Sequence, residues 1–359
     1  MGSVLIIDTE YETVDEAVQK VFNHFNPPEE DVLIKPNLLG GFPPEQHVTT
    51  HPSLVRALVS YCEKKNITIT VGDNPAGRGN LVKRANRAGL YEASQGHFQD
   101  ISEGKDIIAD SEFFSKLVIS RKVLQSSYII NVPKFKTHLQ TIITGALKNM
   151  FGVLPGEEKS MIHASARSLE SFSRALVDIY SVRPPDLTVM DAIVGMEGNG
   201  PSSGKLRHIG KILASDNAVE LDAVMAYMMG LNPSEVPMLR YAHEKQLGEI
   251  RVEKIEIEGE MQRIPGFKVP SKALVRFITP LTSRYYDFLA VKPRLAREKC
   301  VRCWECVEKC PVSALRRNEY PHITKECVSC FCCVEVCENH AMEVSSRARD
   351  LFNRSLLKI

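Results

Sequence analysis

The cysteine spacing near the C-terminus constrains this chain more than any other feature. Nine of its ten cysteines stand between positions 300 and 337, and eight of them form two copies of the pattern C-x2-C-x2-C-x3-C. That pattern is typical of chains that hold two [4Fe–4S] clusters: three closely spaced thiolates bind one cluster, and the fourth cysteine reaches across to the other. The spacing therefore predicts two clusters with crossed ligands. The first set is Cys300, Cys303, Cys306 and Cys337, and the second is Cys327, Cys330, Cys333 and Cys310.

Two other uses of these cysteines fit less well. A structural zinc site needs four ligands and would leave the other cysteines without a role. Disulfides need an oxidising compartment, and the N-terminal residues 1–8 have neither the basic flank nor the long apolar run of a secretory signal. One ambiguity stays open, because Cys332 stands directly beside Cys333. The regular spacing favours Cys333 as the ligand.

Residues 297–344 resemble a bacterial-type two-cluster ferredoxin. Pro311 follows the fourth cysteine of the first copy, and the two copies end alike in Ala314-Leu315 and Ala341-Met342. The second copy departs from the usual pattern, since Glu338 stands where the family commonly has proline. The resemblance implies a small α+β module that carries electrons and works with a redox partner protein.

Charge and hydropathy narrow the setting. The chain has 45 Lys and Arg against 44 Asp and Glu, so no global basic excess indicates a nucleic-acid partner. No span of about 20 uncharged apolar residues occurs, and we expect no transmembrane helix. Eight thiolate ligands need reducing conditions, and a cytoplasmic location is therefore expected.

The first 258 residues predict an α/β domain in which short apolar strands alternate with amphipathic helices. Such alternation is typical of a largely parallel sheet with helices on both faces. Strands are expected at residues 4–7, 32–34, 67–71, 128–132, 187–190, 211–214 and 255–257. Helices are expected at residues 14–25, 53–64, 81–90, 169–182, 218–229 and 235–246.

Two further segments complete the predicted organisation. Residues 259–296 are expected to form a partly helical linker, with an apolar stripe at 273–291 that packs on the body of the protein. A role for this stripe at a membrane surface is the alternative. Residues 345–359 are expected to form a helical tail behind the cluster module, which occupies 297–344.

A second group of polar residues gathers between positions 131 and 163, where lysines and histidines stand among apolar residues. A buried lysine needs an anion, a carboxylate or a lowered pKa, so the group predicts a cleft for an anionic small molecule. Ligands of open α/β sheets bind beyond the carboxyl ends of the strands, and several of these residues follow strands. The candidate catalytic residues are Lys148, His138 and His163. The candidate binding residues are Lys35, Lys134, Lys136, Asn149, Lys159, Asp191 and Glu197. A flavin stays open as an occupant, without a motif to support it.

The same region resembles the family called domain of unknown function 362. The resemblance rests on stretches such as VLIKPNLL, VGDNPAGRG, NVPKFKTH, TGALKNMFGVLPGEEK and DAIVGMEGNGPSSGK, and it covers nearly all of residues 30–250. Members frequently carry a C-terminal two-cluster ferredoxin module. A fainter similarity, to the N-terminal domain of nickel-pincer lactate racemases, rests on the spacing of His138, Lys148 and His163. It concerns fold and cleft location only.

These observations leave two functions open. In the first, the clusters pass single electrons to a substrate or cofactor in the α/β domain, as in an iron–sulfur oxidoreductase or a maturation factor. In the second, the chain is a non-enzymatic electron carrier whose α/β domain docks a partner complex. A purely structural role for the clusters, as in some nucleic-acid enzymes, is disfavoured by the near-neutral charge.

Overall fold

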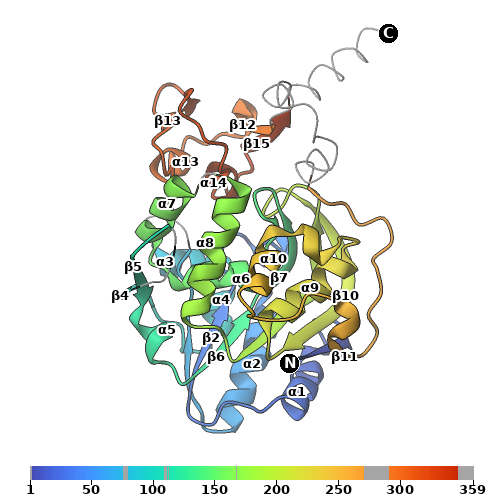
Figure 1. Cartoon of the computed structure of the whole chain (residues 1–359). Helices are drawn as coiled ribbons and strands as arrows, with labels where there is room; N and C mark the ends of the chain where they lie inside the picture. Colours follow the sequence, from blue (N-terminus) through green and yellow to red (C-terminus); the bar gives the residue numbers. More distant parts are fainter. Residues whose placement is uncertain are drawn as a thin grey trace.

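A computed structural model describes residues 2–75, 80–108, 111, 113–166, 168–270 and 291–346. Figure 1 shows a sheet with helices on either side, and a smaller module with α13 and α14 above it. Within the described ranges, no helix combines the length and apolar character needed to cross a bilayer. The predicted stripe at 273–291 and the tail beyond residue 346 lie outside the described residues, apart from residue 291.

The main sheet runs in the order β11-β1-β10-β9-β6-β2-β3, with β7 attached to β9 and β8 attached to β7. Strands β9, β6, β2 and β3 are parallel to one another, whereas β10 pairs antiparallel with both β9 and β1. The prediction of a largely parallel sheet is confirmed. The strands are β1 (Ser3–Asp8), β2 (Asp31–Pro36), β3 (Thr68–Val71), β6 (Tyr128–Val132), β7 (Lys134–His138), β8 (Ile142–Ile143), β9 (Leu187–Glu197), β10 (Lys205–Ser215) and β11 (Glu256–Glu258).

Alternate residues of each strand pack into separate cores on the two faces of the sheet. In β1, Val4 and Ile6 belong to one core and Leu5 and Ile7 to the other. This period of two is what a sheet covered on both faces requires. The first core is completed by α6 (Gly145–Asn149), α8 (Leu169–Val182), α9 (Ala218–Met228) and α10 (Pro237–Glu244), and the second by α1 (Val14–His24), α2 (Pro52–Lys64), α3 (Leu81–Arg87) and α4 (Leu90–Ala93).

Local differences from the predicted elements have physical causes. The helix expected at 81–90 is divided into α3 and α4, because Gly89 adopts a left-handed φ of 71° that ends a right-handed helix. The sequence analysis did not predict the hairpin of β4 (Gly104–Ile108) and β5 (Lys116–Ser120), the short helix α5 (Arg121–Gln125), or α7 (Gly156–Ser165).

The C-terminal module repeats its backbone as well as its cysteines. Arg302, Trp304 and Ser313 have positive φ, and so do Ser329, Phe331 and His340, each 27 positions later, the same interval as from Cys300 to Cys327. Helices α13 (Glu305–Glu308) and α14 (Cys332–Glu335) begin directly after the second of these positions. Two small ladders frame the module, β12 (Val291–Leu295) with β15 (Met342–Ser346) and β13 (Leu315–Arg316) with β14 (His322–Ile323). Strand β12 therefore falls within the segment predicted as linker.

Polar contacts attach the module to the α/β domain mainly through its second repeat. The Glu338 carboxylate accepts a hydrogen bond from the Gly41 backbone N–H at 3.0 Å and pairs with Arg87. Ser202 donates to the Val334 carbonyl oxygen at 3.3 Å. Glu338 is the residue that departs from the ferredoxin pattern, and the structure gives it an interdomain contact.

Candidate functional site: a cysteine module beside a basic pocket

Charges of neighbouring thiols act on two buried cysteines, Cys306 and Cys333. Burial, followed by the charges of three other thiols, raises the pKa of Cys306 to about 12. Those three are the other predicted ligands of the first cluster, Cys337, Cys303 and Cys300. Burial likewise raises the pKa of Cys333, with further contributions from Cys330, Cys306, Cys327 and Cys310. Cys306 aside, these are the predicted ligands of the second cluster.

The donor set fits iron–sulfur clusters in its environment too. Cys310 Sγ accepts the Ala314 N–H at 3.1 Å, and Cys337 Sγ accepts the Ala341 N–H at 3.2 Å. Ala314 and Ala341 are equivalent in the two repeats, so both crossing thiolates receive a backbone hydrogen bond. Such bonds stabilise the added negative charge of a reduced cluster and help to set its potential. In the part of the chain described, no three His, Cys, Asp or Glu side chains are close enough to share a single metal ion.

Cys332 lies between the second group of predicted ligands and the interdomain pocket. A hydrogen bond from its side chain lowers the pKa of Cys330, and Cys332 also lines the pocket described next.

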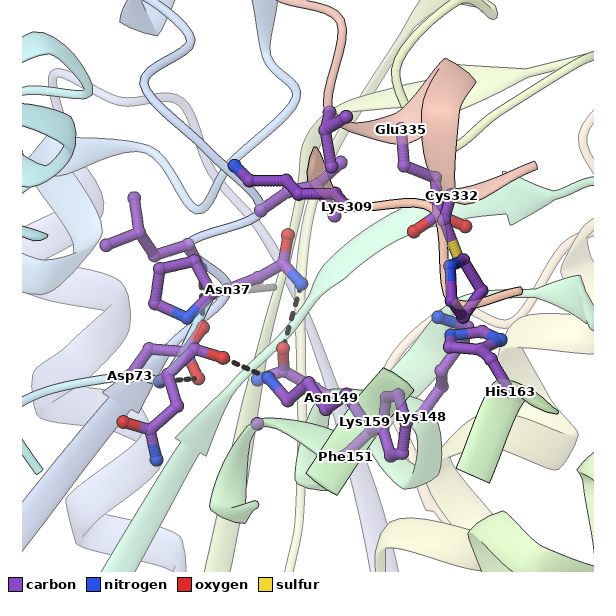
Figure 2. Close-up of a pocket in the computed structure, with 17 residues that line it drawn as sticks. Asn37, Asp73, Lys148, Asn149, Phe151, Lys159, His163, Lys309, Cys332 and Glu335 are labelled. Carbon is purple, nitrogen blue, oxygen red and sulfur yellow. Dashed lines mark hydrogen bonds between the residues drawn. The ribbon is translucent and has the colours of Figure 1, made fainter. Parts of the chain in front are cut away.

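A pocket lies between the α/β domain and the cysteine module, beyond the carboxyl ends of β2 and β3 (Figure 2). The space that solvent-sized groups can occupy in it is about 80 Å³. The α/β domain contributes Asn37, Asp73, Asn74, Lys148, Asn149, Phe151, Lys159 and His163 among others. The module contributes Lys309, Pro311, Cys332, Glu335 and Val336.

Lys35 forms part of the floor beneath this pocket. It lies on β2, on the same face as Leu33, and its Nζ is fully buried 2.8 Å from Asp73 Oδ1. A side chain at Gly152 would collide with both partners, since a Cβ there would stand 2.1 Å from Asp73 Oδ1 and 2.5 Å from Lys35 Nζ. The glycine therefore allows the chain to pass over a buried ion pair.

Lys148 and Asn149 are positioned by helix α6. Asp222 holds the start of this helix, because its carboxylate accepts the backbone N–H groups of Ala146 at 2.6 Å and Leu147 at 2.9 Å. Burial raises the pKa of Asp222 to about 7 although these bonds oppose the rise. Lys148 is half-buried, and its Nζ lies 5.9 Å from the centroid of the Phe151 ring.

Lys159 and His163 share one face of α7, because they are four residues apart. Burial is the main cause that lowers the pKa of Lys159 to about 7, and its ammonium donates to the Asn74 carbonyl oxygen. His163 stacks on Phe172 with ring centroids 4.5 Å apart, and burial lowers its pKa to about 3. Its ring is therefore neutral at pH 7, and its buried Nδ1 has no hydrogen-bond partner among the residues that the structure describes.

His138 and Glu335 bring the two domains together at the edge of the pocket. His138 Nδ1 accepts the N–H groups of Gln140 at 3.1 Å and Thr141 at 3.3 Å, so the ring proton lies on Nε2. That nitrogen stands 2.8 Å from Glu335 Oε1, at an angle that gives neither atom a regular hydrogen bond. Burial would raise the pKa of Glu335, but the neighbouring His138 and Lys148 outweigh it and hold the pKa at about 2.

A chain of buried amides connects Lys136 to the pocket. Lys136 Nζ donates to Asn37 Oδ1 at 2.9 Å, and Asn37 Nδ2 donates to Asn149 Oδ1 at 2.9 Å. Asn149 Nδ2 in turn donates to Asn131 Oδ1 at 2.8 Å. Burial, and then the charge of Lys148, lower the pKa of Lys136 to about 7.

The structure places three of the candidates outside the pocket. Lys134 and Asp191 form a fully buried ion pair at 2.7 Å, next to Tyr11, whose hydroxyl donates to Asp191 at 3.1 Å. Glu197 lies elsewhere, where its carboxylate accepts the Lys268 backbone N–H at 3.2 Å. The candidates that line the pocket are Lys148, Asn149, Lys159 and His163, while Lys35, Lys136 and His138 contact residues that line it.

Several pocket residues were not among the candidates. Asn37, Asp73 and Asn74 follow β2 and β3, so the strand-end rule could have selected them. Glu335 carries no such signal, because it stands inside the x3 gap between Cys333 and Cys337.

Comparisons with known proteins agree with the two-part organisation. Residues 294–316 match the family described as 4Fe-4S binding domain. Over 228 residues, the chain is 33% identical to "Thylakoid-associated protein sll1697" of Synechocystis sp. (strain ATCC 27184 / PCC 6803 / Kazusa), covering 63% of this chain and 70% of that protein.

Among solved structures, the chain matches that of the lactate racemase apoprotein from Thermoanaerobacterium thermosaccharolyticum. The alignment has a TM-score of 0.41 and 12% identity, and it covers 65% of this chain and 58% of that one. At this level the likeness says nothing of activity.

The α/β region shows to which family the chain belongs. Residues 32–227, more than half of the chain, match the family described as Domain of unknown function (DUF362), in line with the resemblance carried by the motifs above. This chain belongs to that family, and its C-terminal part contains a 4Fe-4S binding domain.

Proposed function

We propose that this protein is a redox enzyme or redox maturation factor in which two [4Fe–4S] clusters pass single electrons to a small anionic molecule in the interdomain pocket. The observation that carries the proposal is the shared wall of that pocket. Pro311, Cys332 and Val336 line it, and each is next in sequence to a predicted cluster ligand. A molecule in the pocket would therefore contact residues that are adjacent in sequence to predicted ligands of both clusters.

The charges around the pocket favour an anion. The positive charge of Lys148 lowers the pKa of every titratable neighbour in this group, so Lys148 is central to it. The neighbours are Lys136, His138, Lys159, His163 and Glu335. No carboxylate of the described residues pairs with the ammonium of Lys148 at ion-pair distance, whereas Lys35 is paired with Asp73 and Lys309 with Glu305. A ligand carboxylate or phosphate would supply the missing partner.

The size of the pocket favours a small occupant. A space of about 80 Å³ suits a small acid, or one charged end of a larger molecule, better than the ring system of a flavin. One buried atom of a lining residue, His163 Nδ1, has no hydrogen-bond partner among the described residues. It is suited to bind a polar ligand, because an unsatisfied buried polar atom costs about 1–3 kcal/mol.

Lys159 is the best placed residue for a proton-transfer role. A group with a pKa near the working pH can both give and take a proton, and the pKa of Lys159 is lowered to about 7. In this proposal, the clusters supply electrons singly and Lys159 balances charge by donating a proton to the reduced molecule.

Anaerobic purification followed by mass analysis of bound small molecules tests the proposal. We expect the fully clustered protein to carry a small anion, and the Lys148→Met variant to lose it while keeping its iron. Lys20→Met on the exposed face of α1 is the matched control and should retain the ligand. Fully clustered protein without any ligand, in all three forms, would instead favour an electron carrier whose α/β domain docks a partner.

A further inference from the structure

The outer face of the cysteine module differs from the face that meets the pocket. Cys303 is the one exposed cysteine among those described, and its neighbour Val301 has 64% of its surface exposed. In the second repeat, the equivalent thiol, Cys330, is partly covered. If electrons leave through the pocket side, the first repeat offers the access from solvent.

Basic side chains are concentrated in two segments near this exposed thiol. Residues 297–304 and 315–322 contain five basic side chains and two acidic ones, and two of the basic ones pair with carboxylates outside these segments, Lys299 with Glu343 and Arg317 with Glu308. The basic residues are Arg297, Lys299, Arg302, Arg316 and Arg317, and the acidic ones are Glu298 and Glu319. We call this set the arginine face.

Aromatic contacts hold the arginine face together. The guanidinium groups of Arg302 and Arg297 lie 4.5 Å and 5.3 Å from the centroid of the Tyr320 ring, and Arg302 also donates to the Tyr320 hydroxyl at 3.1 Å. Arg317 lies 5.4 Å from the centroid of Trp304. Such contacts restrict the arginine side chains, so less freedom is lost when a partner binds.

The charges are not needed to build the repeat. Ser329 occupies the position equivalent to Arg302, and Glu343 the position equivalent to Arg316. Both copies nevertheless share the same positive-φ backbone. The arginines are therefore a property of the exposed copy alone, which indicates a role outside the module.

We infer that the arginine face is the docking surface for an acidic one-electron carrier protein, which reduces the cluster at Cys303. Complementary charge orients and accelerates such encounters, and the contact is expected to weaken with salt. In each encounter the carrier loses one electron and the cluster gains one, without any bond being made or broken. The inference rests on the proposed function. It adds the surface where electrons enter the protein, whereas the pocket is where they leave the clusters.

A binding experiment with a plant-type [2Fe–2S] ferredoxin, an acidic carrier, tests the inference. The dissociation constant is measured anaerobically with both proteins oxidised, at low and high ionic strength. We expect Arg302→Glu to weaken binding at least tenfold and Arg316→Glu, which is farther from the ligands, several-fold. Lys20→Glu on α1, at the opposite end of the molecule, makes the same charge change and should have no effect (Figure 1).

A second measurement separates docking from the state of the clusters. Reduction by dithionite, which needs no docking surface, should reach the same extent in all these variants. The inference is overturned if the ferredoxin does not bind, if binding is insensitive to salt, or if both arginine variants bind like the wild type. Lys148→Met should bind the carrier normally. If the fully clustered wild type binds the carrier but carries no small anion, the proposed function is refuted and this inference stands.

Discussion

The two cysteine repeats have the same backbone and opposite surroundings. In the first, Glu308 is exposed and pairs with Arg317 at 2.7 Å, with more than half of the arginine side chain in solvent. In the second, the equivalent Glu335 is buried against His138 of the α/β domain. Both copies reach the pocket, the first through Lys309 and Pro311, but only the second places its glutamate against the α/β domain.

This comparison separates what the repeat needs from what function adds. The four cysteines and the three positive-φ positions recur in both copies, so they belong to the cluster-holding fold. Arg302 does not recur, because Ser329 stands in its sister position, and Glu335 recurs as Glu308 but only Glu335 is buried against the α/β domain. A pair of repeats can in this way become a directional path, with one side adapted to a carrier and the other to a substrate.

The largest effect is expected from breaking the crossed ligation. Cys337 belongs to the second repeat but is predicted to bind the first cluster, so Cys337→Ser should reduce the iron content from about eight to about four per chain. Cys332→Ser should retain about eight, because Cys332 is not in the ligand set. Iron analysis and cluster absorption of anaerobic material give the answer. Loss of iron in the Cys332 variant with retention in Cys333→Ser would reverse the assignment.

The extent to which sequence could anticipate this structure differs between regions. The cysteine spacing predicts the ligand groups, because three ligands of each cluster are close in sequence and the fourth has a regular place in the other repeat. The apolar runs located β1, β2, β3 and β6, because buried strands have a period of two or a continuous apolar run.

Strand β7 shows why the pocket was harder to predict. Every one of its residues is buried, including Lys134 and Lys136, yet lysines in a sequence normally indicate a solvated segment. Their partners, Asp191 for one and Asn37 for the other, are distant in sequence and come close only in the fold. The same is true of Glu335, whose partner His138 lies in the other domain.

The next largest effect concerns the stability of the two equivalent glutamates. Glu335→Ala would remove a buried carboxylate that lies 2.8 Å from His138 Nε2, and loss of such a buried interdomain contact costs about 0.5–3 kcal/mol. Glu308→Ala removes an exposed ion pair, which contributes about 0–1 kcal/mol. Thermal unfolding of the anaerobic proteins should show a clear fall in Tm for the first and little change for the second. Equal Tm values would mean that the interdomain contact does not stabilise the fold.

The smallest effect we predict is a pH dependence of anion binding in the pocket. Lys159, with its pKa lowered to about 7, is charged below that pH and loses its charge as the pH rises through it. Affinity for an anion should therefore be highest below pH 7 and fall above it. Sulfate is a suitable probe because its own charge is constant from pH 6 to pH 8.5. Loss of one charge-assisted contact of about 1.4 kcal/mol raises the dissociation constant for sulfate about tenfold.

Two substitutions show whether Lys159 is the titrating group. Lys159→Met should bind sulfate weakly at every pH, and Lys159→Arg should bind it without the fall above pH 7, because a guanidinium stays charged. His163 cannot cause the same profile, since its pKa of about 3 keeps it neutral throughout the range. If the wild type and Lys159→Met have the same pH profile, the titrating group lies elsewhere, and the buried Lys136, whose pKa is also about 7, becomes the residue to change next.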